Sequence, residues 1–329
     1  MPEMPVPDVS IVICTCDRAV QLEQLLHSIA VQETLLTREI LVVDNHPEAK
    51  ALGELRERFG EVRWLEEPRR GLSYARNAGI RAARGQAVVF VDDDMTVPPL
   101  WLENLAGGVV GGDFGMMMGP VLPEKLDTRA EQIFEAYGGH GHSMEPGEYD
   151  LHWLRQQRFV LPLWSVGGVG NSAVSRRLFE DSRIGLFEEA LGVGTRAGSW
   201  EDLYFLYLLL RGRETVRREP RAAVSHAHRE TMTGLREQLC GYRRGEVCFC
   251  LLVLFRHGDL RGLSHLFFWI PWWRFRLLAG EINRRLQGDR LLSFSLMARE
   301  TLAYLGGPWA LVASLRRAAA LRVPDGRGK

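Results

Sequence analysis

The sequence has few of the features that mark membrane-spanning, secreted or disulfide-bonded proteins. No apolar run reaches about 18 residues, the length that a membrane-spanning helix needs, so no span is expected. Residues 1–8 are rich in proline and acid, without the basic start and apolar core of a secretory signal. Only five of the 329 residues are cysteine, an odd number. We interpret all five as reduced core thiols of a cytoplasmic protein.

Two common nucleotide-binding motifs are also missing. No Gly-x-Gly-x-x-Gly opens a helix after the first apolar strand, and no Gly-x-x-x-x-Gly-Lys-Ser/Thr occurs. These absences argue against dinucleotide oxidoreductases and P-loop enzymes. Repeats and low-complexity segments are lacking as well. The composition, 46% hydrophobic and 25% charged, is that of an ordinary globular protein of one or two domains.

The net charge is zero, but the charges are unevenly distributed. Residues 211–329 hold 22 Lys and Arg against 10 Asp and Glu, whereas residues 1–210 hold 19 against 31. A basic C-terminal part is typical of proteins that meet an anionic surface.

Aromatic residues and arginines alternate in the C-terminal part of the chain. For residues 262–290 this pattern favours an amphipathic helix at a membrane surface, which would place the protein at the inner face of the membrane. For residues 235–255, helices that pack on the rest of the protein or in a homodimer are favoured. Nucleic acid is disfavoured as a partner, because the aromatic clusters are more apolar than a base-stacking platform requires.

Short apolar runs alternate with helical patterns over the first 230 residues. Strands are predicted at 9–14, 39–43, 62–65, 87–91 and 116–121, from 171, and within 214–228. Helices are predicted after residue 18, at 48–59, 71–85, from 99, at 176–181, at 199–211 and from 235, with a glycine-rich turn at 107–115 and loops at 138–158 and 185–199. This alternation predicts a mostly parallel α/β sheet flanked by helices.

Residues 87–101 are the stretch around which the chain is organised. The apolar run 87–91 ends at Asp92, Asp93 and Asp94, which places three carboxylates at the tip of a buried strand. Open α/β sheets bind their ligands at such tips. Adjacent carboxylates repel one another, so a cation is expected there, and oxygen ligands suit Mg²⁺ or Mn²⁺. The alternative is a solvated acidic turn that caps the next helix.

Further acids and one arginine extend this cluster. Asp17 and Asp44 follow the first two predicted strands, so three strand tips offer carboxylates to one crevice. Arg76 lies on the helix before the triplet and could pair with a diphosphate or, equally, as a surface residue with a nearby acid.

Two later patterns are also candidates for chemistry. Ser199-x-x-Asp202 matches a capping box before an apolar helix. Asp202 is alternatively a general base, held as the anion by the helix dipole. His226 and His228 alternate on a predicted strand and are expected to point to one face, where one of them could complete a metal site.

In this order, the motifs resemble family 2 glycosyltransferases with the GT-A fold. The matching residues are 9–18, 39–45, 71–79, 90–94, 101–102, 170–174, 200–202 and 226. The resemblance covers residues 9–230. It implies a GT-A catalytic domain over residues 1–232, with a nucleotide-sugar half at about 1–122 and an acceptor half at about 123–232. A helical, basic, aromatic-rich extension over residues 233–329 follows.

The resemblance implies an inverting transfer of a sugar from a nucleotide-diphosphate sugar to an acceptor hydroxyl on a glycan, a lipid-linked molecule or a small molecule. It implies Asp202 as the general base beside Glu201, and Asp94 and His226 as ligands of Mg²⁺ or Mn²⁺. The residues expected around the donor are Thr15, Asp17, Arg18, Asp44, Asn45, Arg76, Asn77, Asp92, Asp93 and Asn171. Of the triplet, Asp93 is expected to point away.

Two positions depart from the family pattern. Asp17 stands where the family usually has asparagine, which changes the hydrogen bonds that the position can make. Leu203, Tyr204 and Phe205 replace an acidic continuation after Asp202, which predicts apolar surroundings for the acceptor.

Two alternative functions use the same acidic residues. One is a sugar-nucleotide binding protein without transfer activity. The other is a metal-dependent nucleotidyltransferase, which would typically show a glycine-rich, basic loop after the first strand, whereas residues 14–18 contain no glycine.

Overall fold

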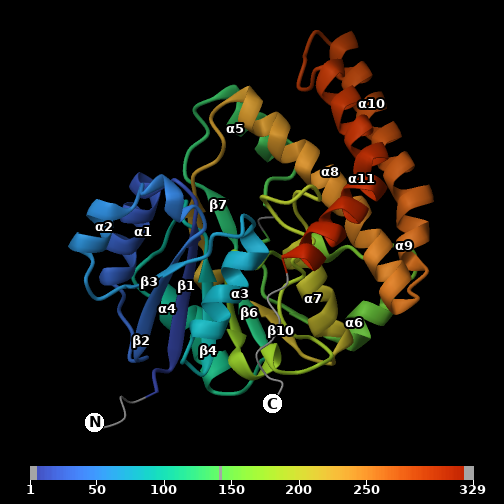
Figure 1. Ribbon diagram of the computed structural model, residues 1–329. Helices are drawn as coiled ribbons and strands as arrows, with labels where there is room; N and C mark the ends of the chain where they lie inside the picture. The colour runs from blue at the N-terminus through green and yellow to red at the C-terminus, as the bar shows by residue number, and fades with distance from the viewer. Residues whose placement is uncertain (1–5, 141–142, 322–329) are drawn as a thin grey trace.

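The computed structural model describes residues 6–140 and 143–321. Residues 1–5, which belong to the segment judged to lack a secretory signal, and 141–142, which belong to a predicted loop, lie outside the described residues. At the centre is an eight-stranded sheet of order β3-β2-β1-β4-β9-β6-β10-β8 (Figure 1). Its strands are β1 (Val9–Thr15), β2 (Arg38–Asp44), β3 (Arg63–Glu66), β4 (Ala87–Val91), β6 (Met116–Met118), β8 (Gly147–Tyr149), β9 (Asn171–Ser175) and β10 (Val216–Arg218).

The sheet is mixed and mostly parallel, as predicted. Strands β3, β2, β1 and β4 run parallel to one another, and β10 runs parallel to β6. Strand β9 is antiparallel to both β4 and β6, and β8 is antiparallel to β10. A second, three-stranded sheet consists of β5 (Met95–Thr96), β11 (Val224–His226) and β7 (Val121–Pro123).

Helices cover both faces of the large sheet because its central strands are apolar on both sides. On one face, Ile11 and Ile13 of β1 pack with α1 (Ala19–Ala30), α2 (Gly53–Arg58) and α4 (Trp101–Val110). On the other face, Val12 packs with α3 (Leu72–Ala82) and with the core of α7 (Glu201–Arg211). The alternation of inward residues along β1 therefore divides the core into two layers.

The C-terminal extension consists of helices that pack on this core. They are α8 (Met232–His257), α9 (Arg261–Ser264), the π-helical η5 (His265–Trp269), α10 (Ile270–Leu286) and α11 (Phe294–Ala320). Cys248 and Phe249 of α8 join the same buried cluster as α7, which agrees with the packing favoured for residues 235–255. Helix α11 runs beside α8 (Figure 1). Among the described residues, no helix combines the length and apolarity needed to cross a membrane.

Several predicted boundaries were wrong. The helix predicted at 48–59 divides into η1 (Pro47–Ala49) and α2, and the segment predicted to be a loop at 138–158 contains β8 and α6 (Leu151–Gln156). Helix α4 continues through the predicted glycine-rich turn as far as Val110. The remaining short elements are α5 (Arg129–Ala136), η2 (Leu163–Ser165), η3 (Arg176–Phe179) and η4 (Pro220–Ala222).

Two glycines explain other differences. The helix predicted to end at Gly85 ends at Ala82, and a side chain at Gly85 would lie 2.5 Å from the backbone nitrogen of Ser10. Gly85 therefore permits close packing rather than capping the helix. The strand predicted at 116–121 is interrupted at Gly119, where a Cβ would lie 2.0 Å from the carbonyl oxygen of Ala222.

Candidate active site

The acidic strand tips meet at one edge of the sheet. Thr15, Asp44 and Asp92 end or follow the neighbouring parallel strands β1, β2 and β4. Strand β9 starts at this edge because it is antiparallel, and the carbonyl of Gly170 accepts a hydrogen bond of 3.0 Å from the Asp92 backbone. A Cβ at Gly170 would lie 2.2 Å from Asp92 Oδ2, so only glycine leaves room for this carboxylate.

Thr15 and Arg18 bind two carboxylates of the triplet. Asp93 accepts hydrogen bonds of 2.7 Å from both Thr15 Oγ1 and Arg18 Nη1. The same Arg18 nitrogen donates to Asp94 Oδ2 at 2.6 Å. Asp93 is only 4% exposed, so its carboxylate is turned into the protein. It anchors the triplet to β1.

Burial and neighbouring charges separate the acidities within the triplet. Burial raises the pKa of Asp93 to about 6, against the opposing effect of Arg18. Burial acts in the same direction on Asp94, but a hydrogen bond from protonated His226 and the charge of Arg18 outweigh it and hold the pKa of Asp94 below its usual range. Asp94 is therefore the member of this pair that stays anionic, as a metal ligand must.

Arg76 joins the triplet to the start of α7. Its Nη2 donates to Asp92 Oδ1 at 3.1 Å and its Nη1 donates to Glu201 Oε1 at 3.0 Å. Arg76 is 3% exposed, so it pairs with acids as one interpretation held, but as a buried residue rather than a surface one. Burial and the adjacent Asp202 raise the pKa of Glu201 to about 7, although Arg76 opposes this shift.

Ser199 and Asp202 do not form the capping box that the sequence predicted at the start of α7. The residue before α7 is Trp200, in a left-handed conformation with φ of 71° and without a side-chain cap. Ser199 instead donates its hydroxyl to the Gly241 carbonyl of α8, because Gly198 brings the two segments into contact. Asp202 Oδ1 accepts from the Leu203 backbone at 2.8 Å, and Oδ2 lies beside Gly168. Burial raises the pKa of Asp202.

The residues after Asp202 do not line an acceptor surface. Leu203, Tyr204 and Phe205 all belong to the buried core. The Tyr204 hydroxyl is 2.9 Å from His257 Nε2 in α8. The apolar continuation therefore fixes α7 against the C-terminal helices.

Three of the predicted donor residues are buried amides that shape the site. Asn45 donates to the carbonyls of Glu67 and Arg69 and accepts from Gly71. Asn77 exchanges two hydrogen bonds with the Phe187 backbone. Asn171 accepts from the indole of Trp101 and donates to the carbonyls of Pro120 and Ala222. Their side chains hold loops around the edge in place.

Asp17 and Asp44 lie on the outer side of the edge. Asp17 has a φ of 61° and is exposed, with Oδ2 2.7 Å from His46 Nδ1. Asp44 is buried and accepts from the His46 backbone and from Arg56 Nη2, at 3.0 and 3.1 Å.

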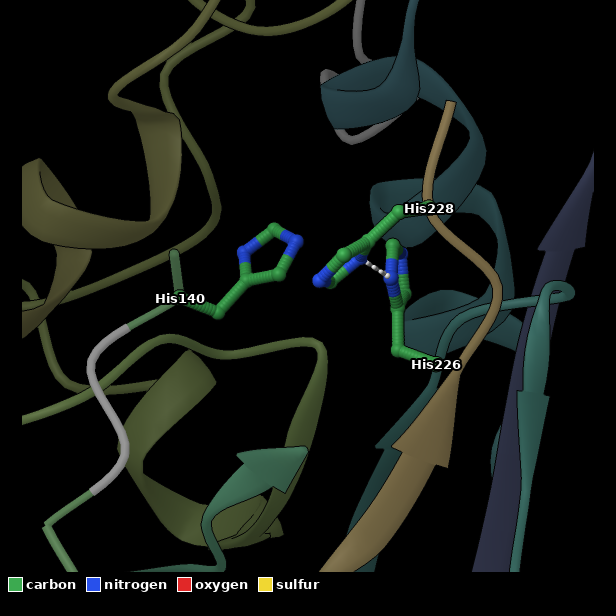
Figure 2. Close-up of side chains that lie close together, drawn as sticks. All are labelled: His140, His226 and His228. Carbon is green, nitrogen blue, oxygen red and sulfur yellow. Dashed lines mark hydrogen bonds between the residues drawn. The ribbon is translucent and has the colours of Figure 1, made fainter. Parts of the chain in front are cut away.

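A histidine cluster adjoins Asp94, and part of it was missed from the sequence. His226 Nε2 lies 3.3 Å from Asp94 Oδ1, and the Nδ1 atoms of His226 and His228 are 2.8 Å apart. Glu135 of α5 and His140 approach this pair from a different segment, as Figure 2 shows for His140. The His-x-His spacing in the sequence revealed His226 and His228. Glu135 and His140 lie about 90 residues earlier in the chain and form no recognisable sequence motif. Arg229 was also missed. Burial and, next, the charge of Arg18 lower its pKa.

Comparison with known proteins identifies the family. Residues 10–182, more than half of the chain, match the family model "Glycosyl transferase family 2". The chain belongs to this family. Among curated relatives of the family 2 chain, a glucosyl-dolichyl phosphate glucuronosyltransferase of Haloferax volcanii is 30% identical over 136 residues, 39% of this chain and 43% of the relative. A pre-mycofactocin glycosyltransferase of Mycobacterium tuberculosis is 27% identical over 171 residues, 51% of this chain and 33% of the relative. The family 2 chain thus spans less than half the length of these relatives.

Solved structures share the fold. TarS 1–349 of S. aureus in complex with UDP-GlcNAc has a TM-score of 0.57 and 17% identity, over 95% of the family 2 chain and 83% of TarS 1–349. The mannosyltransferase PcManGT of Pyrobaculum calidifontis in complex with GDP-Man and Mn²⁺ has a TM-score of 0.50 and 19% identity. The match covers 97% of the family 2 chain and 77% of PcManGT. These likenesses support the GT-A-like fold expected from the sequence.

Proposed function

We propose that the protein is an inverting glycosyltransferase in which Asp202 is the general base. The observation that carries this proposal is the division of roles at the start of α7. Glu201 accepts a hydrogen bond from Arg76, whereas Asp202 accepts one from the Leu203 backbone and keeps Oδ2 beside Gly168. Asp202 accepts the proton of an acceptor hydroxyl, and its raised pKa makes it a stronger base than an ordinary aspartate.

The donor occupies the edge formed by β1, β2 and β4. Exposed Asp17 and buried Asp44 offer carboxylates to the hydroxyl and N–H donors of a nucleoside. The cations near the triplet, Arg18 and Arg229, stabilise the negative charge of the leaving diphosphate. Arg76 joins Asp92 to Glu201, the residue before the proposed base, so the donor site and the start of α7 are parts of one hydrogen-bonded network.

Mg²⁺ or Mn²⁺ fits the side chains at Asp94. Asp94 Oδ1 and His226 Nε2 lie 3.3 Å apart, close to the separation of about 3 Å between neighbouring ligands on an ion with bonds of roughly 2.1 Å. A carboxylate and an imidazole together suit Mn²⁺. When bound, the ion would neutralise charge on the diphosphate.

The C-terminal helices are proposed to contact an anionic membrane surface. Helices η5 and α10 expose Phe267, Phe268 and Phe275 by 69%, 75% and 69%. Arg276 and Arg284 of α10 are also exposed. Aromatic side chains with flanking arginines are suited to the interface of an anionic bilayer, where a lipid-linked acceptor would be available.

Asp202→Asn tests the proposed base. With UDP-GlcNAc and GDP-Man as first donors and Mg²⁺ or Mn²⁺ present, donor affinity measured by calorimetry should be unchanged. The release of nucleoside diphosphate with acceptor should fall by about 10²–10⁴-fold. Asp181→Asn, at a surface carboxylate paired with Arg183, is the matched control. Transfer at the wild-type rate by Asp202→Asn would refute the assignment. Donor binding by the wild type without transfer to any acceptor would support the sugar-nucleotide binding alternative.

A further inference from the structure

A continuous chain of polar contacts runs from the triplet to α5. Asp94 Oδ1 faces His226 Nε2 at 3.3 Å, His226 Nδ1 faces His228 Nδ1 at 2.8 Å, and His228 Nε2 faces Glu135 Oε1 at 2.7 Å. Figure 2 shows the two imidazoles side by side, with the dashed contact between their Nδ1 atoms. Both histidines are buried, at 8% and 6% exposed. Their rings are therefore held in fixed orientations.

The hydrogen bonds determine which ring nitrogens carry protons. A carboxylate only accepts, so the proton between His228 and Glu135 lies on His228 Nε2. In neutral His228 the Nδ1 atom is then an acceptor, and His226 Nδ1 must donate to it. In this tautomer His226 Nε2 has a lone pair that faces Asp94 Oδ1, and two such acceptors repel each other unless a proton or a metal ion lies between them.

We propose that Glu135 and His228 are positioning residues that hold His226 in the tautomer able to bind the donor-site metal. Because imidazole is a better ligand for Mn²⁺ than for Mg²⁺, this pair also biases the site toward Mn²⁺. Partners of this kind fix ring orientation and raise the basicity of a ligating histidine. The inference rests on the metal of the proposed function and extends it to two residues that touch neither metal nor donor.

A different arrangement, a separate transition-metal site on His140, His226 and His228, fits the distances less well. Ligand atoms of the three rings lie within 4.8 Å of one another. Two imidazoles on one tetrahedral ion, however, keep their nitrogens about 3.3 Å apart, given bonds of about 2.0–2.1 Å. The 2.8 Å between the Nδ1 atoms is instead a hydrogen-bond distance. His140 packs its ring against His226 with centroids 4.6 Å apart.

Binding of Mn²⁺ alone to the full chain, followed by the electron paramagnetic resonance signal of free Mn²⁺, tests the proposal without any acceptor. His228→Phe removes the acceptor for His226 Nδ1 and should weaken Mn²⁺ binding by about 10–100-fold. His228→Asn places an amide oxygen near the position of Nδ1 and should restore most of the affinity. Glu135→Gln should give an intermediate loss. Competition with Mg²⁺ should show that the preference for Mn²⁺ falls in parallel.

Two control variants discriminate between the arrangements. His140→Ala should leave Mn²⁺ affinity unchanged, as should His152→Ala on the exposed side of α6. Equal losses in His140→Ala and His228→Phe would support the three-histidine site and overturn the proposal. It would also be overturned by unchanged affinity in His228→Phe, or by a wild type that binds no Mn²⁺. Normal Mn²⁺ binding without sugar transfer would count only against the proposed function.

Discussion

Removal of the Arg76 side chain should destabilise the protein by the cost of an uncompensated buried charge. Arg76 contacts two carboxylates, but their side chains differ in exposure, at 35% for Asp92 and 6% for Glu201. Water can solvate Asp92 once Arg76 is gone, whereas Glu201 remains buried. The expected loss for Arg76→Met is therefore that of one broken buried pair, about 3–5 kcal/mol, rather than twice that value.

The loss should depend on pH with a defined sign. The folded-state pKa of Glu201 is already raised to about 7, above its ordinary value of 4.5, and removal of Arg76 raises it further. The difference in stability grows as the pH rises above about 7 and is fully present only above the higher pKa of Glu201 in the variant, where the wild type keeps a paired anion and the variant an unpaired one. As the pH falls through 7, Glu201 becomes protonated in both proteins and the difference shrinks.

Denaturant unfolding at pH 8.5 and pH 6 measures both effects. In thermal melts the loss at pH 8.5 corresponds to roughly 6–15 °C, at about 2–3 °C per kcal/mol. The double variant Arg76→Met/Glu201→Gln removes the unpaired Glu201 carboxylate and should recover most of the stability lost in Arg76→Met. A loss below about 1 kcal/mol, or a double variant as unstable as the single one, would show that Arg76 and Glu201 are not the coupled pair described here.

Two further predictions concern the donor edge and the C-terminal helices. Gly170→Ala should lower kcat/KM by about 100-fold by displacing Asp92, while Gly107→Ala, where a Cβ would contact nothing within 4 Å, should not; equal activities would contradict the close approach at Gly170. The triple change Phe267→Ser, Phe268→Ser and Phe275→Ser should abolish flotation with anionic vesicles, whereas Leu35→Ser, at another exposed apolar residue, should not. Unchanged flotation, or a shift from dimer to monomer in light scattering, would assign the aromatic face to something other than the bilayer.

The strand tips were predictable because they depend on local patterns. The apolar runs that form β1, β2 and β4 end abruptly in polar residues, and parallel neighbours place those ends at one edge. The order of the family motifs in the sequence then predicted that residues of β9 and α7 also belong to the site. These features depend on periodicity and adjacency, which a single sequence displays directly.

The parts that could not be predicted depend on contacts between distant segments. The capping box failed at Ser199 because Gly241, 42 residues later, takes its hydroxyl. Asn77 was assigned to the donor, yet its amide is used by Phe187, 110 residues away. Glu135 has no motif of its own and acquires a role only when α5 comes to rest beside His228. Nothing in the local sequence encodes such pairings.

The pairing of the Asp triplet with two arginines explains how three adjacent carboxylates can be accommodated. Three adjacent carboxylates would repel one another if they shared a single cation. Two arginines divide the three: Asp92 pairs with Arg76, whereas Asp93 and Asp94 share Nη1 of Arg18, and Asp93 also accepts from Thr15. Asp94 also faces His226 Nε2 at 3.3 Å, which is why the divalent ion of the proposed function is assigned to this carboxylate. In the proposed function the outer two carboxylates act on the donor, while the middle one, buried against β1, fixes the turn that separates them.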